Sequence, residues 1–157
     1  MSRPVRIALI VALGAVFIVV SLGVGRVLGA RGAERVLVEQ VIRDQASGNV
    51  QGIARELPDC GLGTKCHANV VKLLAKVSGP GLPLEILQIT QAAGVSPGGS
   101  TGVARIAWHI GSRLPVVQCL VIQKTGNVVS GFGVHLRKLS NPIDREGACP
   151  GVPNLLV

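Results

Sequence analysis

The first feature of the chain is a run without any charged residue, from residue 7 to residue 25. A helix of this length rises about 28 Å at 1.5 Å per residue, close to the thickness of a bilayer's hydrocarbon core. Helices in the cores of soluble proteins rarely carry apolar side chains on every face. The run therefore predicts a transmembrane helix, preceded by a short basic N-terminal tail of residues 1–6.

A cleaved signal peptide is the alternative for this segment. Its apolar part would normally span about 7–15 residues, fewer than are found here, although Ala30-Arg31-Gly32 offers a cleavage site. Residues 26–33 are rich in Gly and Arg, and we expect them to form a juxtamembrane linker. Arg26 and Arg31 of this linker, together with Arg35, would then contact anionic lipid headgroups. The length of the run favours the uncleaved anchor.

After the linker the apolar positions recur with the period of a helix. This pattern predicts three helices, over residues 34–47, 49–57 and 66–77. Gly48 suits the C-terminal cap of the first helix, and Asn49 can cap the second. The positions expected to face inward are Val38, Val41, Ile42, Val50, Ile53, Leu57, Val70, Leu73 and Leu74.

Beyond Ser78-Gly79-Pro80-Gly81 the apolar period changes from helical to two residues. Four strands are predicted, over residues 83–92, 101–110, 115–124 and 128–139, with turn-rich segments such as KTGN between them. The third strand is apolar on both faces and is expected to be central. The inward face is expected to consist of Ala104, Ile106, Trp108, Ile110, Phe132, Val134 and Leu136.

Helices followed by sequential hairpins predict an α+β fold. We expect an N-terminal transmembrane helix, then three helices packed on a curved antiparallel four-stranded sheet. The α+β domain would cover residues 34–140. Residues 141–157 contain three prolines and Cys149, and are expected to form a disulfide-tethered C-terminal tail.

Two short segments near the first helix boundary carry a resemblance to a known family. Ala46-Ser47-Gly48-Asn49-Val50, Ile53 and Leu57-Pro58-Asp59 are similar to the A-x-G-D-x-x-x-L…L-x-P-D run that joins two helices in the nuclear transport factor 2-like fold. The strands ARIAWHI, PVVQCLVIQ and GFGVHLRKL fit the sheet of that fold. The resemblance covers residues 34–139 and implies a cone-shaped α+β domain, as in ketosteroid isomerase-like enzymes. The layout with one membrane span also resembles accessory membrane proteins of bacterial transport systems.

Enzymes of this family place a carboxylate or histidine in the cone, often with a Tyr or a second acid. This chain has no Tyr, and Glu85 is the only carboxylate between residues 84 and 139. None of the side chains expected to face inward can transfer a proton. The cone is therefore expected to be packed solid or to hold an apolar ligand, with no carboxylate or histidine at its centre. The chain also lacks a G-x-S-x-G elbow, a P-loop and an H-E-x-x-H helix.

Composition and charge narrow the possible partners. Aromatic residues make up 2% of the chain, which argues against the stacking platforms used to bind RNA, so no nucleic acid is expected. Sixteen basic residues against eight acidic ones give a net charge of +8, which favours anionic partners. Strand alternation places four basic or titratable residues on the outer sheet face: Arg105, His109, His135 and Arg137. This face could receive an anionic partner, or it could be an ordinary solvated surface.

The four cysteines, Cys60, Cys66, Cys119 and Cys149, all follow the apolar run. An oxidising compartment would pair them, which predicts that the C-terminal domain is extracytoplasmic. The flanking arginines do not favour either orientation. Of the three possible pairings we favour Cys60–Cys66 with Cys119–Cys149. The five-residue gap between Cys60 and Cys66 is outside the usual zinc-ligand spacing, so no metal is expected.

These observations support one main hypothesis of function. We expect a non-enzymatic, membrane-anchored, extracytoplasmic domain that needs no cofactor and acts as a protein-interaction scaffold or accessory subunit. Its partners would be the lipid bilayer and another membrane or envelope protein. One alternative is an enzyme or a carrier of lipophilic small ligands that uses the cone pocket. Another is a secreted soluble domain released by signal cleavage.

Overall fold

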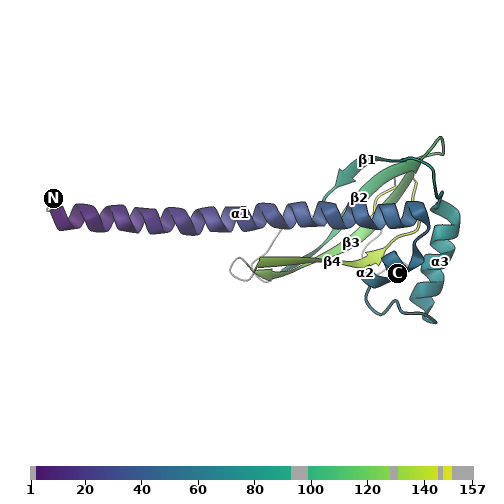
Figure 1. Cartoon of the computed structure of the whole chain (residues 1–157), viewed down its shortest axis with the longest axis horizontal. Helices are drawn as coiled ribbons and strands as arrows, with labels where there is room; N and C mark the ends of the chain where they lie inside the picture. Colours follow the sequence, from purple (N-terminus) through teal and green to yellow (C-terminus); the bar gives the residue numbers. More distant parts are fainter. Residues whose placement is uncertain (1–2, 93–98, 128–130, 145–146, 150–157) are drawn as a thin grey trace.

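The computed structural model describes residues 3–92, 99–127, 131–144 and 147–149. Its elements are α1 (Arg3–Ser47), α2 (Val50–Glu56), α3 (Lys65–Val77), β1 (Leu84–Thr90), β2 (Ser100–Ile110), β3 (Val116–Asn127) and β4 (Gly131–Leu139). The four strands form an antiparallel sheet in the order β1-β2-β3-β4. The predicted α+β class is confirmed, and Figure 1 shows α1 extending far beyond the rest of the fold.

The linker predicted over residues 26–33 is wrong, because these residues lie inside α1. The apolar segment and the first predicted domain helix are therefore one continuous helix of 45 residues. Gly29 and Gly32 each weaken a helix by about 1 kcal/mol, but extending an existing helix costs less than nucleating a new one. The only proline of α1 is Pro4, in its first turn. Residues 26–33 therefore contain no proline that would break the helix.

The junction between α1 and α2 follows the predicted capping chemistry. Gly48 adopts a φ of 77° directly after α1, a conformation that glycine adopts without steric strain. The Asn49 side chain then accepts a hydrogen bond from the backbone N–H of Gly52 at 3.0 Å. A Cβ at Gly52 would lie 2.6 Å from an oxygen of Asp44, so a larger residue there would displace the Asp44 carboxylate, which accepts a hydrogen bond from Nδ2 of Asn49 at 2.8 Å.

The third strand is longer than predicted. The KTGN segment, expected to be a turn, belongs to β3, and Lys124 and Thr125 pair with Val134 and Gly133 of β4. The alternation of core-facing side chains therefore continues from Ile122 to Lys124. The start predicted for the fourth strand, residues 128–130, lies outside the described residues.

The core lies between the helices and one face of the sheet. Ala104, Ile106, Trp108, Ile110 and Leu136 are buried there, as predicted. Val134 is only half-buried at the margin of the core. Phe132 is also half-buried, so its assignment to the core is wrong. It has the predicted parity, but its part of β4 runs beyond the core, beside α1 and away from α2 and α3 (Figure 1).

The other face of the sheet is covered at its centre by the C-terminal tail. Cys119 and Cys149 form a disulfide, and Ile143 donates its backbone N–H to the carbonyl of Val117 at 2.8 Å. Cys119 and Val121 are buried in a second small apolar cluster beneath this tail. The tail explains why the central strand β3 is apolar on both faces.

Candidate functional site

The core between the helices and the sheet contains a polar contact that orients its largest side chain. Trp108 is fully buried, and its Nε1–H donates to Oε1 of Gln118 at 3.0 Å. Gln118 in turn donates from Nε2 to the carbonyl of Ser140 at 3.2 Å. The buried amide therefore satisfies the indole and links the core to the end of β4. Amide and indole groups are not proton-transfer groups near neutral pH.

A buried ion pair occupies the end of the core that faces the apolar segment. Nζ of Lys124 lies 2.7 Å from Oε2 of Glu34, and the two side chains are 3% and 0% exposed. Glu34 Oε1 also accepts the backbone N–H of Ala92 at 2.6 Å, and Lys124 donates to the carbonyl of Ala92 at 3.3 Å. The pair connects α1, β3 and the segment after β1.

The sequence interpretation did not anticipate this pair. Glu34 begins the helix predicted over residues 34–47, and Lys124 ends the strand predicted over residues 115–124. A signal was nevertheless present, since Glu34 lies four residues before Val38 on the inward stripe of α1. Lys124 likewise follows Leu120 and Ile122 on the core-facing parity of β3. A buried carboxylate therefore does border the core, at its end rather than at its centre.

The four residues predicted to form an anion-binding face are not brought together. Gln123, the β3 partner of His135, pairs with Thr101, eight residues before His109 in β2. Eight strand residues span about 26 Å. His109 is also engaged, with Nε2 3.2 Å from Oε2 of Glu85 and Nδ1 2.8 Å from the carbonyl oxygen of Gly111.

Two of the four do lie close together at the β4 edge. Arg137 donates from Nε to Oε1 of Gln123, the residue that pairs with His135. His135 and Arg137 are both exposed, and with Arg55 of α2 they line a pocket of about 330 Å³. Arg105 is half-buried and lines a different pocket, of about 310 Å³, beside Pro115.

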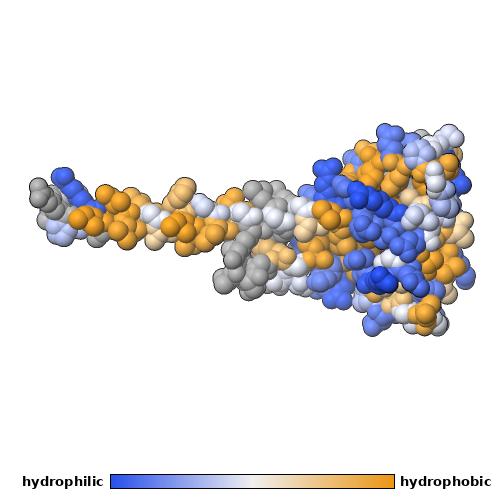
Figure 2. Space-filling view, viewed as in Figure 1, coloured by the Kyte–Doolittle hydropathy of each residue, from blue (hydrophilic) through white to orange (hydrophobic). Residues whose placement is uncertain are grey.

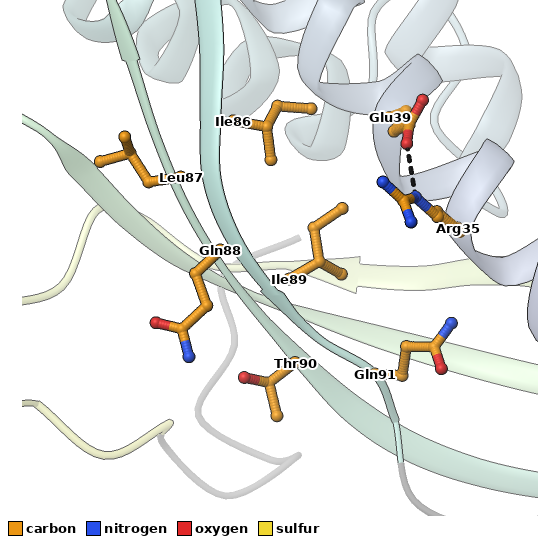
Figure 3. Close-up of a pocket in the computed structure, with 8 residues that line it drawn as sticks. All are labelled: Arg35, Glu39, Ile86, Leu87, Gln88, Ile89, Thr90 and Gln91. Carbon is orange, nitrogen blue, oxygen red and sulfur yellow. Dashed lines mark hydrogen bonds and ion pairs between the residues drawn. The ribbon is translucent and has the colours of Figure 1, made fainter.

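The largest of the described pockets is a groove beside the edge strand β1. It has a volume of about 630 Å³ and is lined by every residue from Ile86 to Gln91 and by Arg35 and Glu39 of α1. Figure 3 shows Ile86, Ile89 and Gln91 pointing toward α1, while Leu87, Gln88 and Thr90 point away. Arg35 donates from Nε to Glu39 at 2.8 Å and closes the helix side of the groove.

The juxtamembrane arginines are only partly described. Arg35 is exposed and paired with Glu39, which also accepts a hydrogen bond from Arg43 at 3.2 Å. The side chains of Arg26 and Arg31 lie outside the described part of the chain. The predicted contact of these arginines with lipid stays a prediction.

The cysteine pairing predicted from the sequence is confirmed. Cys60 is bonded to Cys66 and Cys119 to Cys149. Within the described residues, no three metal-ligating side chains gather at one place. Comparison with known protein families, characterised proteins and solved structures finds no match for this chain.

Proposed function

We propose that this chain is a single-pass membrane protein. Its extracytoplasmic part, which begins at residue 34 and is called the head below, is a scaffold for another membrane or envelope protein. Pro4–Gly25 is long and apolar enough to cross a bilayer, with a mean hydropathy of 2.9, and none of it is buried. Figure 2 shows apolar side chains along this part of α1, against the more hydrophilic face of the head. Two disulfides favour an oxidising compartment for the head.

The continuous helix is the observation that carries this proposal. Residues Ala30-Arg31-Gly32, the candidate cleavage site, lie within α1, and the same helix supplies Val38, Val41 and Ile42 to the core. The apolar segment is thus a direct extension of a structural element of the head. This arrangement favours an uncleaved anchor that holds the head at a set distance from the bilayer.

The groove beside β1 is the proposed binding site for the partner. Among the described residues β1 pairs with β2 alone, so its outer backbone groups are available to another strand. Ile86 and Ile89 offer an apolar floor, and the ion pair of Arg35 and Glu39 offers a polar wall. An extended segment with alternating apolar and polar side chains fits such a groove.

A second copy of the chain in the same bilayer does not fit this role. Antiparallel pairing of two β1 strands would require a two-fold axis perpendicular to the sheet. Two copies anchored side by side would instead need an axis along the bilayer normal, and hence along α1. Because α1 runs across the face of the sheet (Figure 1), these two axes cannot coincide. The partner strand is therefore expected to come from a different protein.

Photo-crosslinking in intact membranes tests the groove. A photoreactive residue at position 89, where the side chain points toward α1 (Figure 3), should crosslink a partner through an extended segment. The same residue at position 62 should not, because Leu62 is 80% exposed and does not line the groove. A synthetic peptide of that segment should bind the purified protein. Ile89→Lys should weaken this binding about tenfold, the equivalent of one lost apolar contact, and Leu62→Lys, outside the groove, should leave it unchanged. Equal crosslinking at both positions, or peptide binding insensitive to Ile89→Lys, would contradict the proposal.

A further inference from the structure

The hairpin of β3 and β4 extends toward the apolar segment of α1. In Figure 1 it runs back beside the helix, away from α2 and α3. The described part of its tip is formed by Thr125 and Gly126 of β3 and by Phe132 and Gly133 of β4, which pair with them. This part of the hairpin lies beyond the ion pair of Glu34 and Lys124.

The length of the hairpin matches the distance to the bilayer. Glu34 follows Gly25, the end of the apolar segment, by nine residues, or about 13 Å of helix. From Lys124, which contacts Glu34, β3 continues for three residues to Asn127, or about 10 Å of strand. The headgroup layer adds about 5–7 Å beyond the hydrocarbon core on each side. The tip therefore reaches the headgroup layer of a bilayer spanned by α1.

The hairpin carries no carboxylate that a negatively charged surface would repel. The first carboxylate of the chain is Glu34, and it is fully buried against Lys124. The sequence contains no Asp or Glu between residues 86 and 143, a stretch that includes the whole hairpin. No carboxylate of the hairpin would therefore be brought against anionic headgroups, where it would be repelled.

We propose that the β3–β4 tip, formed by Thr125, Gly126, Phe132 and Gly133, contacts the phospholipid headgroups of the bilayer that α1 spans. The inference rests on the proposed membrane anchoring. Phe132 pairs with Gly126, two residues or about 7 Å of strand beyond Lys124, which places its half-buried aromatic side chain at the outer part of the headgroup layer. The buried ion pair holds the base of the hairpin against α1 and so sets the height of the tip. The head then has two contacts with the membrane, which fixes its orientation as well as its distance.

Tryptophan fluorescence in vesicles tests this contact. Phe132→Trp is made in the full-length protein, with Leu114→Trp as the matched control, because Leu114 is 79% exposed in the β2–β3 connection. The only native tryptophan, Trp108, is fully buried and provides a common background. The vesicles contain phosphatidylcholine and phosphatidylglycerol, with a nitroxide quencher on the headgroup of a fraction of the lipids.

We expect the quencher to reduce the fluorescence of the Phe132→Trp protein several-fold more than that of the Leu114→Trp protein. Equal quenching of the two proteins would overturn the hairpin contact. Flotation of the same vesicles shows whether the protein is anchored in them at all, and so distinguishes a missing hairpin contact from a missing anchor. Protein that floats without selective quenching refutes the hairpin contact alone, and protein that does not float refutes the proposed anchoring as well.

A charge at the tip provides a second, independent readout. Thr125→Glu in the Phe132→Trp background should lower the quenching clearly, because its carboxylate would face anionic headgroups. Thr125→Gln, which has the same size and no charge, should retain it. Equal quenching of these two variants in anionic vesicles would overturn the proposal that the tip contacts charged headgroups.

Discussion

Glu34 of α1 and Lys124 of β3 form an ion pair of 2.7 Å in which both side chains are removed from solvent. Moving two charges out of water costs several kcal/mol per ion, and the mutual attraction offsets this only when both partners are present. The pair lies where the apolar extension of α1 leaves the head. Its main consequence is therefore a defined junction between the apolar segment of α1 and the domain that follows it.

Removal of one partner of this pair should destabilise the head strongly. Lys124→Met leaves the Glu34 carboxylate buried without its cation, and we expect a loss of roughly 3–5 kcal/mol in the free energy of unfolding. Glu34→Gln/Lys124→Met keeps an acceptor for Ala92 and should recover much of this loss. Urea denaturation of the full-length protein in detergent measures both. Arg35→Ala, which breaks an exposed pair, should cost less than about 1 kcal/mol. A Lys124→Met protein as stable as the wild type would contradict the prediction.

The contact between Trp108 and Gln118 provides a second stability test. Gln118→Leu would leave the buried indole N–H and the carbonyl of Ser140 without a partner, at a cost of about 1–3 kcal/mol. The urea midpoint should fall, whereas the same substitution at the exposed Gln88 should leave it unchanged. Equal midpoints for the two variants would show that water or another group satisfies Trp108.

Both disulfides should be complete in the mature protein. Thiol labelling of protein that is denatured but not reduced should find no free cysteine. Labelling of all four would place the head in a reducing compartment. Replacing Cys119 and Cys149 together by Ser should destabilise the head by about 3.7 kcal/mol on the loop-entropy model, because the unfolded chain then gains the conformational freedom that the bridge removes.

The apolar segment should keep the protein in the membrane. Carbonate or high salt should leave it in the pellet, and only detergent should release it, since a spanning helix is held by its apolar surface. The mass of the mature protein provides the control for processing. A mass that lacks the first 30 or so residues would instead support signal cleavage.

Local patterns were sufficient to predict most of the elements. The two-residue alternation of Ala104, Ile106 and Trp108 identified a core-facing strand, and helical spacing identified Val38, Val41 and Ile42 as inward. The nuclear transport factor 2-like resemblance stays a prediction. Local patterns gave wrong element boundaries where a helix or a strand continues through residue types that usually end such an element. The glycines of residues 26–33 suggested a linker and KTGN suggested a turn, yet both segments continue a helix or strand that is stabilised on either side.

The sequence by itself determined the apolar segment and the α+β order of elements. These follow from composition and from periodicities within a few residues, which act whatever the rest of the chain does. Only the tertiary structure decided that Glu34 meets Lys124, that His109 and His135 lie far apart, that Phe132 leaves the core and that β1 borders an open groove. Each of these depends on the register and packing of elements distant in the chain, and local side-chain preferences do not specify that geometry.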